Sequence, residues 1–286
     1  MITFGLLGWP ITHSRSPQIH SLALKLAGLQ GAYELFPIEP ERKAELAAMM
    51  KKVREGQITG LNVTIPYKQE VMPFLDALSP NAKNIGAVNT ITFKNGKVTG
   101  HNTDAPGFEA DLANNGLELS YKPGEAVVFG AGGAARAVFY AFLNNGWQIH
   151  AFVRNVEKSK QVVADLRGKG LSGGIKLYGL ADLSHTLKRN KIDVIVDTTP
   201  LGMAPHIDSS SWPSNVKFPE NCLVYDLVYN PENTLLMKQA TAAGLRASNG
   251  WGMLVEQALL SFEIWTNVKI NRADFNAAWQ HTTHTP

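Results

Sequence analysis

The sequence predicts an α/β protein of two domains, each built on a mostly parallel sheet. The chain has 286 residues, and at roughly 150 residues per domain this length accommodates about two domains. Short apolar runs of strand length alternate with stretches that have the helical period, which is the rhythm of βαβ units. The alternation occurs in two separate series, one in each half of the chain.

The first series begins at the N-terminus. Apolar runs predict four strands, at 4–8, 32–38, 61–65 and 88–93. Apolar residues at helical spacing predict helices around 19–26 and 45–53. Asn95-Gly96 separates two short apolar segments, which predicts a hairpin because both residue types adopt positive φ readily.

The second series predicts five strands with helices between them, at 126–129, 149–153, 175–178, 194–196 and 224–228. Pro, Ser and Asn cluster over 204–219, which indicates a surface loop. After this loop, apolar residues recur at helical spacing, at Leu254, Ala258, Phe262 and Trp265. This last helix lies beyond the second series, which leaves it available to pack on the first domain.

The composition is that of a globular protein, with 44% hydrophobic and 18% charged residues. The 27 Lys and Arg residues against 24 Asp and Glu give a net charge of +3, and no block of like charges favours nucleic acid or an anionic membrane. The single cysteine, Cys222, has no partner for an internal disulfide and lies in an apolar run, which fits a reducing compartment. Without a signal-peptide pattern or an apolar stretch of membrane-spanning length, we expect a cytoplasmic protein.

The strongest local signal is the turn Gly130-Ala131-Gly132-Gly133, which joins an apolar strand to a helix of small residues. Such a turn lets backbone N–H groups and the helix N-terminus approach a pyrophosphate closely. The preceding strand, the helix over 137–143 and a second strand ending near Val153 complete the context of a dinucleotide-binding Rossmann domain. A turn with a purely structural role is the alternative.

The end of that second strand bears on which dinucleotide binds. An Asp or Glu there would bond the adenine ribose hydroxyls of NAD and repel a 2′-phosphate. This chain instead has Arg154, with Lys158 one helical turn further on. A guanidinium grips a phosphate through two parallel hydrogen bonds, so the pattern favours NADP. The alternative is a solvated basic helix start, because surface Arg and Lys are common.

Polar residues also stand at predicted strand ends in the first half. Ser16, followed by Pro17, is typical of a helix N-cap with proline at the first helical position. Capping does not explain Ser14, and two hydroxyls beside helix-start N–H groups are suited to bind a carboxylate.

Three more polar residues are candidates for a site. Lys68 follows a strand, where a lysine with a lowered pKa serves as an acid or base, although most such lysines are solvated. Asp104 precedes a helical stretch and is a ready N-cap, and Gln257 fits the polar face of a helix. The spacing does not show whether the three meet. The tail His281-Thr282-Thr283-His284 offers no third ligand, so we expect no metal site.

The order of these pieces resembles the shikimate dehydrogenase family, from Phe4 to about Trp265. The order is the specific part of the resemblance. The matching motifs, in sequence, are 8–20, 62–68, 86–90, 102–104, the Gly130 turn, 199–203, 225–231 and 249–258.

The resemblance implies a role for individual residues on the substrate side. Ser14 and Ser16 would bind the substrate carboxylate, and Tyr229 would lie beside that carboxylate and the nicotinamide. Lys68 and Asp104 would form the catalytic pair. The ring hydroxyls would be bound by Thr64, Asn89, Asp104 and Gln257.

On the cofactor side, the resemblance implies that the 2′-phosphate of NADP binds Arg154 and Lys158. Gly250 would lie near the nicotinamide, and Leu227 is a further cofactor-binding residue. The pyrophosphate would lie against Gly130, Ala131, Gly132, Gly133 and Ala134.

The chain departs from the family pattern at four positions. Asp197 stands where the family usually has Asn, and Ser21 also replaces an Asn. In the run that recognises the cofactor, Val153 replaces Asn and Asn155 replaces Thr. Asp197 is expected to weaken or reposition a cofactor contact, and the changes around Arg154 affect the strength of the NADP preference.

The resemblance implies a substrate-binding domain formed by 1–104 and 251–286, facing an NADP-binding Rossmann domain over 105–250 across a cleft. The implied reaction is reversible hydride transfer from NADPH to 3-dehydroshikimate, giving shikimate, a step of aromatic amino-acid biosynthesis. We expect small-molecule partners only, no nucleic acid or membrane, and a monomer or homodimer.

Two alternatives stay open at this point. One is a quinate or dual quinate/shikimate dehydrogenase of the same fold, which could use NAD, and Arg154 and Ser16 argue against it. A non-catalytic nucleotide-sensing module would keep the Rossmann turn alone, and the presence of Lys68 and Asp104 argues against that.

Overall fold

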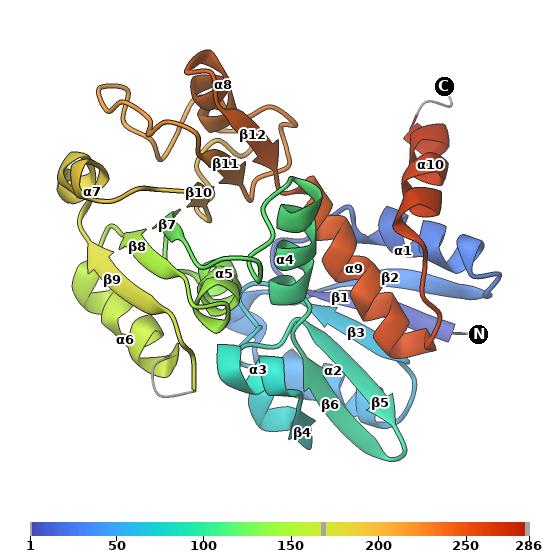
Figure 1. Ribbon diagram of the computed structural model, residues 1–286. Helices are drawn as coiled ribbons and strands as arrows, with labels where there is room; N and C mark the ends of the chain where they lie inside the picture. Colours follow the sequence, from blue (N-terminus) through green and yellow to red (C-terminus); the bar gives the residue numbers. More distant parts are fainter. Residues whose placement is uncertain (1, 167–169, 284–286) are drawn as a thin grey trace. The chain divides into compact units, whose positions relative to one another are not determined.

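The computed structural model describes residues 2–166 and 170–283, which form two compact α/β units (Figure 1). The first unit combines the chain up to Thr103 with the segment from Val255 onward, and the second comprises Asp104–Leu254. Each unit contains a six-stranded, mostly parallel sheet. The predicted fold class is confirmed.

The sheet of the first unit has the strand order β2-β1-β3-β5-β6-β4. β1 pairs in parallel with β2 and β3, β4 pairs in parallel with β6, and β5 runs antiparallel to β3 and β6. The β5–β6 hairpin turns at Asn95 and Gly96, both with positive φ, as the sequence predicts. The strands are β1 (Ile2–Gly8), β2 (Gly31–Pro37), β3 (Gly60–Val63), β4 (Ala77–Leu78), β5 (Thr90–Lys94) and β6 (Lys97–His101).

Helices from both ends of the chain belong to this unit. Between β1 and β6 these are α1 (Ser16–Leu26), α2 (Ala44–Arg54) and α3 (Pro80–Ile85), with the 3-10 turns η1 (Pro40–Arg42) and η2 (Met72–Phe74). At the far end of the chain, α9 (Trp251–Thr266) enters this unit at Val255 and is followed by α10 (Arg272–Thr283). One apolar core lies between α2 and the sheet, with Met50, Val53, Leu61 and Ile91 among its buried members.

Helix α9 packs on the sheet through aromatic side chains. The Trp265 ring stacks on Phe4 of β1 with ring centroids 4.7 Å apart, and its indole N–H donates to the carbonyl oxygen of Ile91 in β5. A Cβ atom at Gly60 of β3 would lie 2.5 Å from the same indole ring. Glycine at position 60 is therefore required for the helix to approach the sheet this closely.

The sheet of the second unit is parallel throughout, with the strand order β12-β11-β10-β7-β8-β9. Taken in chain order, this is the 3-2-1-4-5-6 order of the Rossmann fold. The order reverses between β7 and β10, which creates a crevice at the carboxyl ends of these strands. The strands are β7 (Glu125–Phe129), β8 (Gln148–Phe152), β9 (Gly174–Tyr178), β10 (Val194–Asp197), β11 (Leu223–Asp226) and β12 (Arg246–Asn249).

The helices of the second unit are α4 (Asp104–Asn114), α5 (Gly133–Asn144), α6 (Val156–Leu166), α7 (Leu183–Arg189) and α8 (Leu235–Ala242), with the 3-10 turn η3 (Leu180–Asp182). Helix α5 is buried along most of its length because small and apolar residues cover nearly all of its surface. No helix in the described ranges 2–166 and 170–283 is long and apolar enough to cross a membrane.

One histidine of the first unit is buried among aromatic rings. The His20 ring is fully buried and stacks on Tyr33 with ring centroids 4.3 Å apart. Within the described part of the chain, neither of its ring nitrogens has a hydrogen-bond partner. Burial lowers the pKa of His20 to about 3, because the charged form loses its hydration.

We predict that His20→Phe removes part of the loss of stability at low pH. The pKa of His20 is lower in the folded protein than in the unfolded chain, so its contribution is full above the ordinary pKa of 6.5 and is lost as the pH falls towards 3. From pH 7.5 to pH 5, His20 should lower the free energy of unfolding of the parent by roughly 2 kcal/mol. The variant should not lose this amount. Urea unfolding at both pH values measures the difference.

The exposed His185 supplies the control for this prediction. His185→Gln should leave the pH dependence of unfolding unchanged, because the side chain at position 185 is in contact with water in the folded protein as well. The same pH dependence in His20→Phe and the parent would contradict the assignment.

Candidate active site

The first polar group of the candidate site lies where β1 gives way to α1. Ser14 Oγ donates to Ser16 Oγ at 3.1 Å and accepts the backbone N–H of Ser16 at 3.2 Å. The predicted capping role of Ser16 is wrong: α1 begins at Ser16 itself, and the preceding Arg15 occupies the N-cap position without a side-chain cap. Ser14 takes over part of the capping, because its oxygen accepts an N–H at the helix start. The structure thus brings both hydroxyls together at a helix N-terminus.

Thr64 follows β3, beside the end of β1. Its backbone N–H donates to the carbonyl oxygen of Leu7, and its side chain lies over Gly8, where a Cβ atom would come within 2.3 Å of Thr64 Cγ2. Because β1 and β3 are parallel, Ser14 and Thr64 both follow strands that end at the same edge of the sheet.

Lys68 lies in the turn beyond Thr64 and is half-buried. Its carbonyl oxygen accepts the N–H of Val88 at 2.7 Å, so the backbone at Lys68 is tied to the segment that leads into Asn89. Gln69 Nε2 donates to the carbonyl oxygen of Gly86 in the same segment. Lys68 therefore sits on a fixed turn beside the next predicted site residue.

Asn89 and Gln257 meet in the first unit although 168 positions separate them in the sequence. Asn89 Nδ2 donates to Gln257 Oε1 at 3.3 Å and to Thr103 Oγ1 at 2.8 Å. Asn89 Oδ1 accepts the backbone N–H of Thr103 at 2.8 Å. Two predicted hydroxyl-binding residues are thus in contact, and Asn89 also fixes the residue that precedes Asp104, the buried first residue of α4.

A set of buried polar residues beneath Asn89 and Gln257 is absent from the sequence prediction of the site. Tyr33 donates to Asn62 Oδ1 at 2.8 Å, and Asn62 Nδ2 donates to the Asn89 carbonyl oxygen and to Ser261 Oγ. Asn62 opens a recognised motif, whereas Ser261 belongs to none. The one available signal was a lone hydroxyl residue one helical turn after Gln257 in an otherwise apolar stretch.

In the second unit, the glycine-rich turn follows β7 at the point where the strand order reverses. Gly130 has φ +97°, and a Cβ atom there would lie 2.5 Å from Thr198 Oγ1 after β10. A Cβ at Gly132 or at Gly133, where α5 begins, would meet no heavy atom within 4 Å. The turn therefore leaves open space at a helix N-terminus, where unpaired N–H groups attract an anion. These residues fit the pyrophosphate of a dinucleotide.

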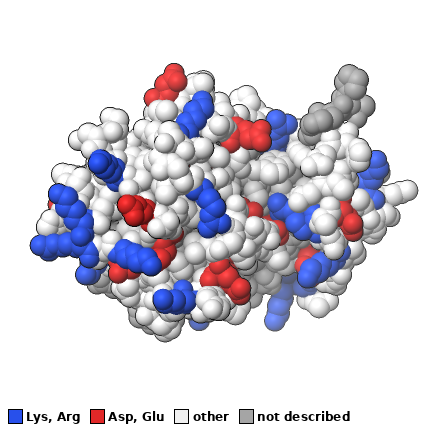
Figure 2. Space-filling model, turned by 45° about the horizontal axis from the view of Figure 1, so that its top comes forward, with Lys and Arg blue, Asp and Glu red and all other residues white. Residues whose placement is uncertain are grey.

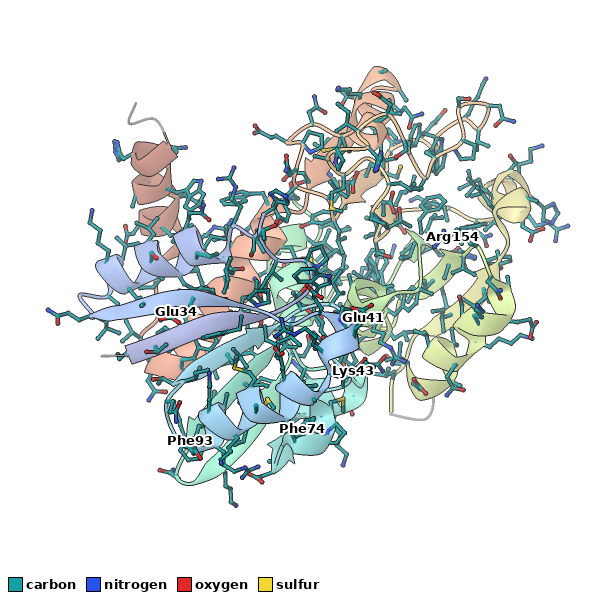
Figure 3. All side chains as sticks on the ribbon, turned by 180° about the vertical axis from the view of Figure 1, so that it is seen from behind. Glu34, Glu41, Lys43, Phe74, Phe93 and Arg154 are labelled. Carbon is teal, nitrogen blue, oxygen red and sulfur yellow. The ribbon has the colours of Figure 1, made fainter. Side chains whose placement is uncertain are left out.

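Arg154 and Lys158 are both exposed, and Arg154 comes shortly after the end of β8 (Figure 3). Asn155 Oδ1 accepts the backbone N–H of Lys158 and thereby caps the start of α6. Neither basic side chain forms an ion pair with any acidic group in the described ranges. By contrast, the nearby Lys160 pairs with Glu157. Arg154 and Lys158 therefore have the charge and exposure that binding a 2′-phosphate requires.

The remaining predicted cofactor residues lie between β11 and α9. A Cβ atom at Gly250 would fall 2.1 Å from the Leu227 carbonyl oxygen, so only glycine fits at position 250. Tyr229 is half-buried and contacts Trp251 edge to face, with ring centroids 6.4 Å apart.

Two buried carboxylates lie side by side at the carboxyl ends of the second sheet. Asp197 of β10 is paired in register with Asp226 of β11, and both are fully buried. Asp226 accepts the Thr234 hydroxyl at 2.6 Å and the Val228 N–H at 2.9 Å. Asp197 Oδ1 accepts an N–H from Thr199, but Oδ2 has no hydrogen-bond partner in the described part of the chain. Burial raises the pKa of Asp226 to about 7 and also raises the pKa of Asp197.

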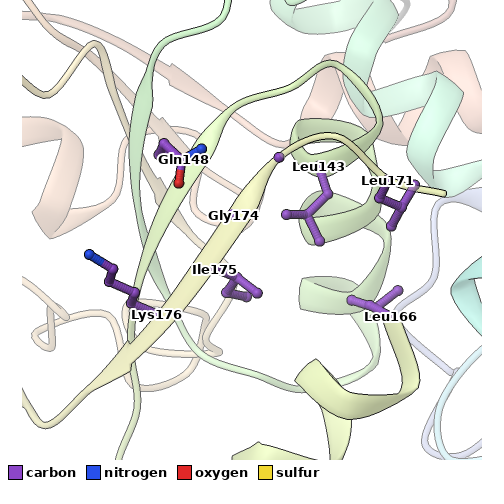
Figure 4. Close-up of a pocket in the computed structure, with 8 residues that line it drawn as sticks. Leu143, Gln148, Leu166, Leu171, Gly174, Ile175 and Lys176 are labelled. Carbon is purple, nitrogen blue, oxygen red and sulfur yellow. The ribbon is translucent and has the colours of Figure 1, made fainter. Parts of the chain in front are cut away.

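Other features of the surface do not compete with these sites. On the face drawn in Figure 2, acidic side chains lie among the basic ones. The described residues contain no group of three or more His, Cys, Asp or Glu side chains arranged to hold a metal ion, and His284 of the C-terminal tail lies outside the described residues. A hollow of about 320 Å³ lies against Gln148 and Gly174 (Figure 4). These two residues begin β8 and β9, whereas ligands of such sheets bind at the carboxyl ends.

Comparison with known proteins agrees with the geometry. A family model of the shikimate dehydrogenase substrate binding domain matches residues 6–91, and one of the shikimate 5′-dehydrogenase C-terminal domain matches residues 250–278. The shikimate dehydrogenase (NADP(+)) of Carboxydothermus hydrogenoformans is 38% identical over 264 residues, which cover 92% of this chain and 91% of that protein.

Two solved structures have the same fold over nearly their whole length. The shikimate 5-dehydrogenase of Thermus thermophilus, in complex with NADP(H) and shikimate, has a TM-score of 0.83 and 33% identity, covering 98% of this chain and 99% of its own. The enzyme of Listeria monocytogenes, in complex with shikimate and NAD, has a TM-score of 0.88 and 29% identity, covering 98% and 96%.

The fold and the polar clusters define an α/β protein in which a Rossmann unit is joined to a second unit with its own sheet and its own polar site. Within that class, the identity and coverage of the relatives settle the assignment. The chain belongs to the shikimate dehydrogenase family.

We predict that Asp197→Asn stabilises the protein at neutral and alkaline pH. A folded-state pKa raised above the ordinary 3.8 means that this carboxyl favours folding at low pH and that the benefit is lost as the pH rises through the folded-state pKa. An amide carries no charge to desolvate, so the free energy of unfolding should rise by about 1–3 kcal/mol at pH 8. Little change is expected at pH 4. Urea unfolding at both values measures the effect, and equal changes at the two would contradict it.

Proposed function

We propose that this chain is an NADP-dependent shikimate dehydrogenase, which catalyses the reversible reduction of 3-dehydroshikimate to shikimate with NADPH. The observation that carries the proposal is the contact between the amides of Asn89 and Gln257, in a unit that also presents Ser14 and Ser16 at a helix N-terminus. Amide groups both donate and accept, as hydroxyl groups do. Hydroxyls and N–H groups at a helix start suit a carboxylate. The first unit thus fits a hydroxylated carboxylic acid.

The first unit binds the substrate and the second binds NADP. Thr64, Asn89 and Gln257 hold the ring hydroxyls, Ser14 and Ser16 hold the carboxylate, and Tyr229 is a further substrate-binding residue. The turn from Gly130 to Ala134 cradles the pyrophosphate, Arg154 and Lys158 bind the 2′-phosphate, and Leu227 and Gly250 border the nicotinamide. NADPH supplies the hydride when bound.

Lys68 and Asp104 form the catalytic pair that moves the proton at the reacting oxygen. Reduction of a ketone requires a proton at the carbonyl oxygen, and a lysine and a carboxylate are both competent to handle it. The residues that bind shikimate fix the substrate against this pair, so that the reaction gains from orientation.

The chain acts on small molecules, without a nucleic acid or membrane partner, as a monomer or homodimer. On the face drawn in Figure 2, acidic and basic side chains are interspersed, which supports the absence of a nucleic acid or membrane partner. The buried free thiol of Cys222 supports a reducing, cytoplasmic compartment.

We predict that Lys68→Ala lowers kcat for shikimate oxidation by about 10²- to 10⁴-fold, because positioned acid–base catalysis contributes that much to rate. The KM for shikimate should change far less. Asp104→Asn should also lower kcat, since an amide of nearly the same size carries no charge. The measurement is NADPH absorbance, with shikimate and quinate assayed separately.

Lys51→Ala, at an exposed position on α2, is the control for the loss of a lysine. It should have parent kinetics. A kcat near the parent value in Lys68→Ala would show that Lys68 is not part of the catalytic pair. If the parent turned over quinate but not shikimate, quinate would be the substrate.

We predict that Arg154 is the main cause of a preference for NADP over NAD. A guanidinium–phosphate contact is worth roughly 1.5–3 kcal/mol, or about ten- to a hundredfold in kcat/KM. Arg154→Ala should raise the KM for NADPH with little change in kcat, and Arg154→Asp should shift the preference towards NAD. The kcat/KM values for both cofactors measure this.

The control is Lys160→Ala on α6, because Lys160 is exposed but paired with Glu157. It should leave both cofactor constants unchanged. An unchanged KM for NADPH in Arg154→Ala would favour the alternative, in which residues 154 and 158 are only solvated basic residues at a helix start.

A further inference from the structure

Ser261 is a buried hydroxyl residue one helical turn beyond Gln257 on α9. Its side chain is fully buried, and a serine in that position requires hydrogen-bond partners. Its Oγ lies 3.1 Å from Asn62 Nδ2 of β3, 2.8 Å from Thr90 Oγ1 of β5 and 3.1 Å from Thr103 Oγ1. One hydroxyl of α9 thus contacts three separate segments in the first 103 residues of the chain.

The direction of the hydrogen bonds at Ser261 follows from groups that only donate or only accept. The Gln257 carbonyl oxygen lies 2.8 Å from Ser261 Oγ and only accepts, so the hydroxyl donates to it. The Asn89 carbonyl oxygen likewise fixes the orientation of the Asn62 amide, whose Nδ2 donates to it at 3.1 Å. The same NH₂ group then donates to Ser261 Oγ. Ser261 therefore connects the backbone of α9 at Gln257 to Asn62.

Two further routes connect Ser261 to Asn89. The Thr90 hydroxyl lies between Ser261 Oγ and Asn89 Oδ1, at 2.8 Å and 2.9 Å. Thr103 Oγ1 lies between Ser261 Oγ and Asn89 Nδ2, at 3.1 Å and 2.8 Å. Through these contacts, one atom of Ser261 influences the positions of both amides that meet in the site.

We propose that Ser261 is a positioning residue for substrate binding, whose hydroxyl holds Asn89 and Gln257 at the separation that the ring hydroxyls of the substrate require. This inference rests on the proposed function. Ser261 Oγ is surrounded by protein partners, so it acts through Asn89 and Gln257 and does not touch the substrate. Its removal therefore weakens the binding of the polyol and leaves the proton and hydride steps in place.

The test is Ser261→Ala, which removes one oxygen atom and adds no bulk. The KM for shikimate should rise about three- to tenfold, as expected for the loss of one hydrogen bond or slightly more. The values of kcat and of the KM for NADP should stay within about twofold of the parent. Thr90→Val removes a neighbouring hydroxyl of the same network at nearly constant shape, and it should give the same selective rise in KM for shikimate.

The matched control is Thr266→Ala on the same helix. The Thr266 hydroxyl also donates to a carbonyl oxygen four residues back, that of Phe262 at 2.8 Å, but it has no contact with the network of Asn62, Thr90 and Thr103. Its loss should leave the KM for shikimate unchanged. Thermal unfolding of each variant verifies that the kinetics are measured on folded protein.

A parent-like KM for shikimate in both Ser261→Ala and Thr90→Val would overturn the inference. An equal rise in Thr266→Ala, or an equal rise in the KM for NADP, would also overturn it, because the effect would then be a general loosening. If the parent chain shows no shikimate-dependent reduction of NADP, the proposed function fails and this inference fails with it. If the parent turns over shikimate normally and the variants have the parent KM for shikimate, the role of Ser261 is refuted and the proposed function is not affected.

Discussion

The close contact of Trp265 with Gly60 and Phe4 is the constraint on which the first unit depends. A sheet with one open apolar face does not fold stably in water. Here that face is covered by α9, whose Ser261 lies 199 positions after Asn62 of β3. An indole ring lies within reach of the β3 backbone only because residue 60 has no side chain. Any larger residue would lift α9 from the sheet. Gln257 and Ser261 lie on the same helix, so Gln257 would lose its contact with Asn89, and Ser261 would lose its contact with Asn62.

Both units place their polar residues by the same device. In a parallel sheet the strands that run together also end together, so residues after neighbouring strands gather at one edge. Ser14 and Thr64 follow the parallel strands β1 and β3 in the first unit. In the second unit the Gly130 turn and Arg154 follow β7 and β8, which are also parallel neighbours. Residues distant in sequence become neighbours without any special local conformation, apart from the positive φ at Gly130.

The sequence predicts what depends on period and on local chemistry, and it misses what depends on contact between distant segments. The strands with apolar runs and the Asn95-Gly96 hairpin follow from local pattern alone. β4 has only two residues and β12 is a polar edge strand, so neither has a hydrophobic period to detect. The Ser16 cap was wrong because α1 begins at Ser16 itself, one residue before the predicted start, and Ser14 Oγ accepts the N–H of Ser16. Ser261 was missed because its partners lie on β3, on β5 and at Thr103, and no local spacing records them.

The orientation of the Asn89 amide determines which atoms of the site donate hydrogen bonds and which accept them. A backbone N–H only donates, so the side-chain atom of Asn89 that faces the Thr103 N–H is its oxygen. The NH₂ group of Asn89 must then face Thr103 Oγ1 and Gln257, and the Gln257 atom that it meets is the oxygen. One main-chain donor thus sets the polarity of two side-chain amides in turn. Under the proposed function, a hydroxyl of the substrate would meet donors and acceptors whose order is already fixed, so that binding would not require the amides to reorganise.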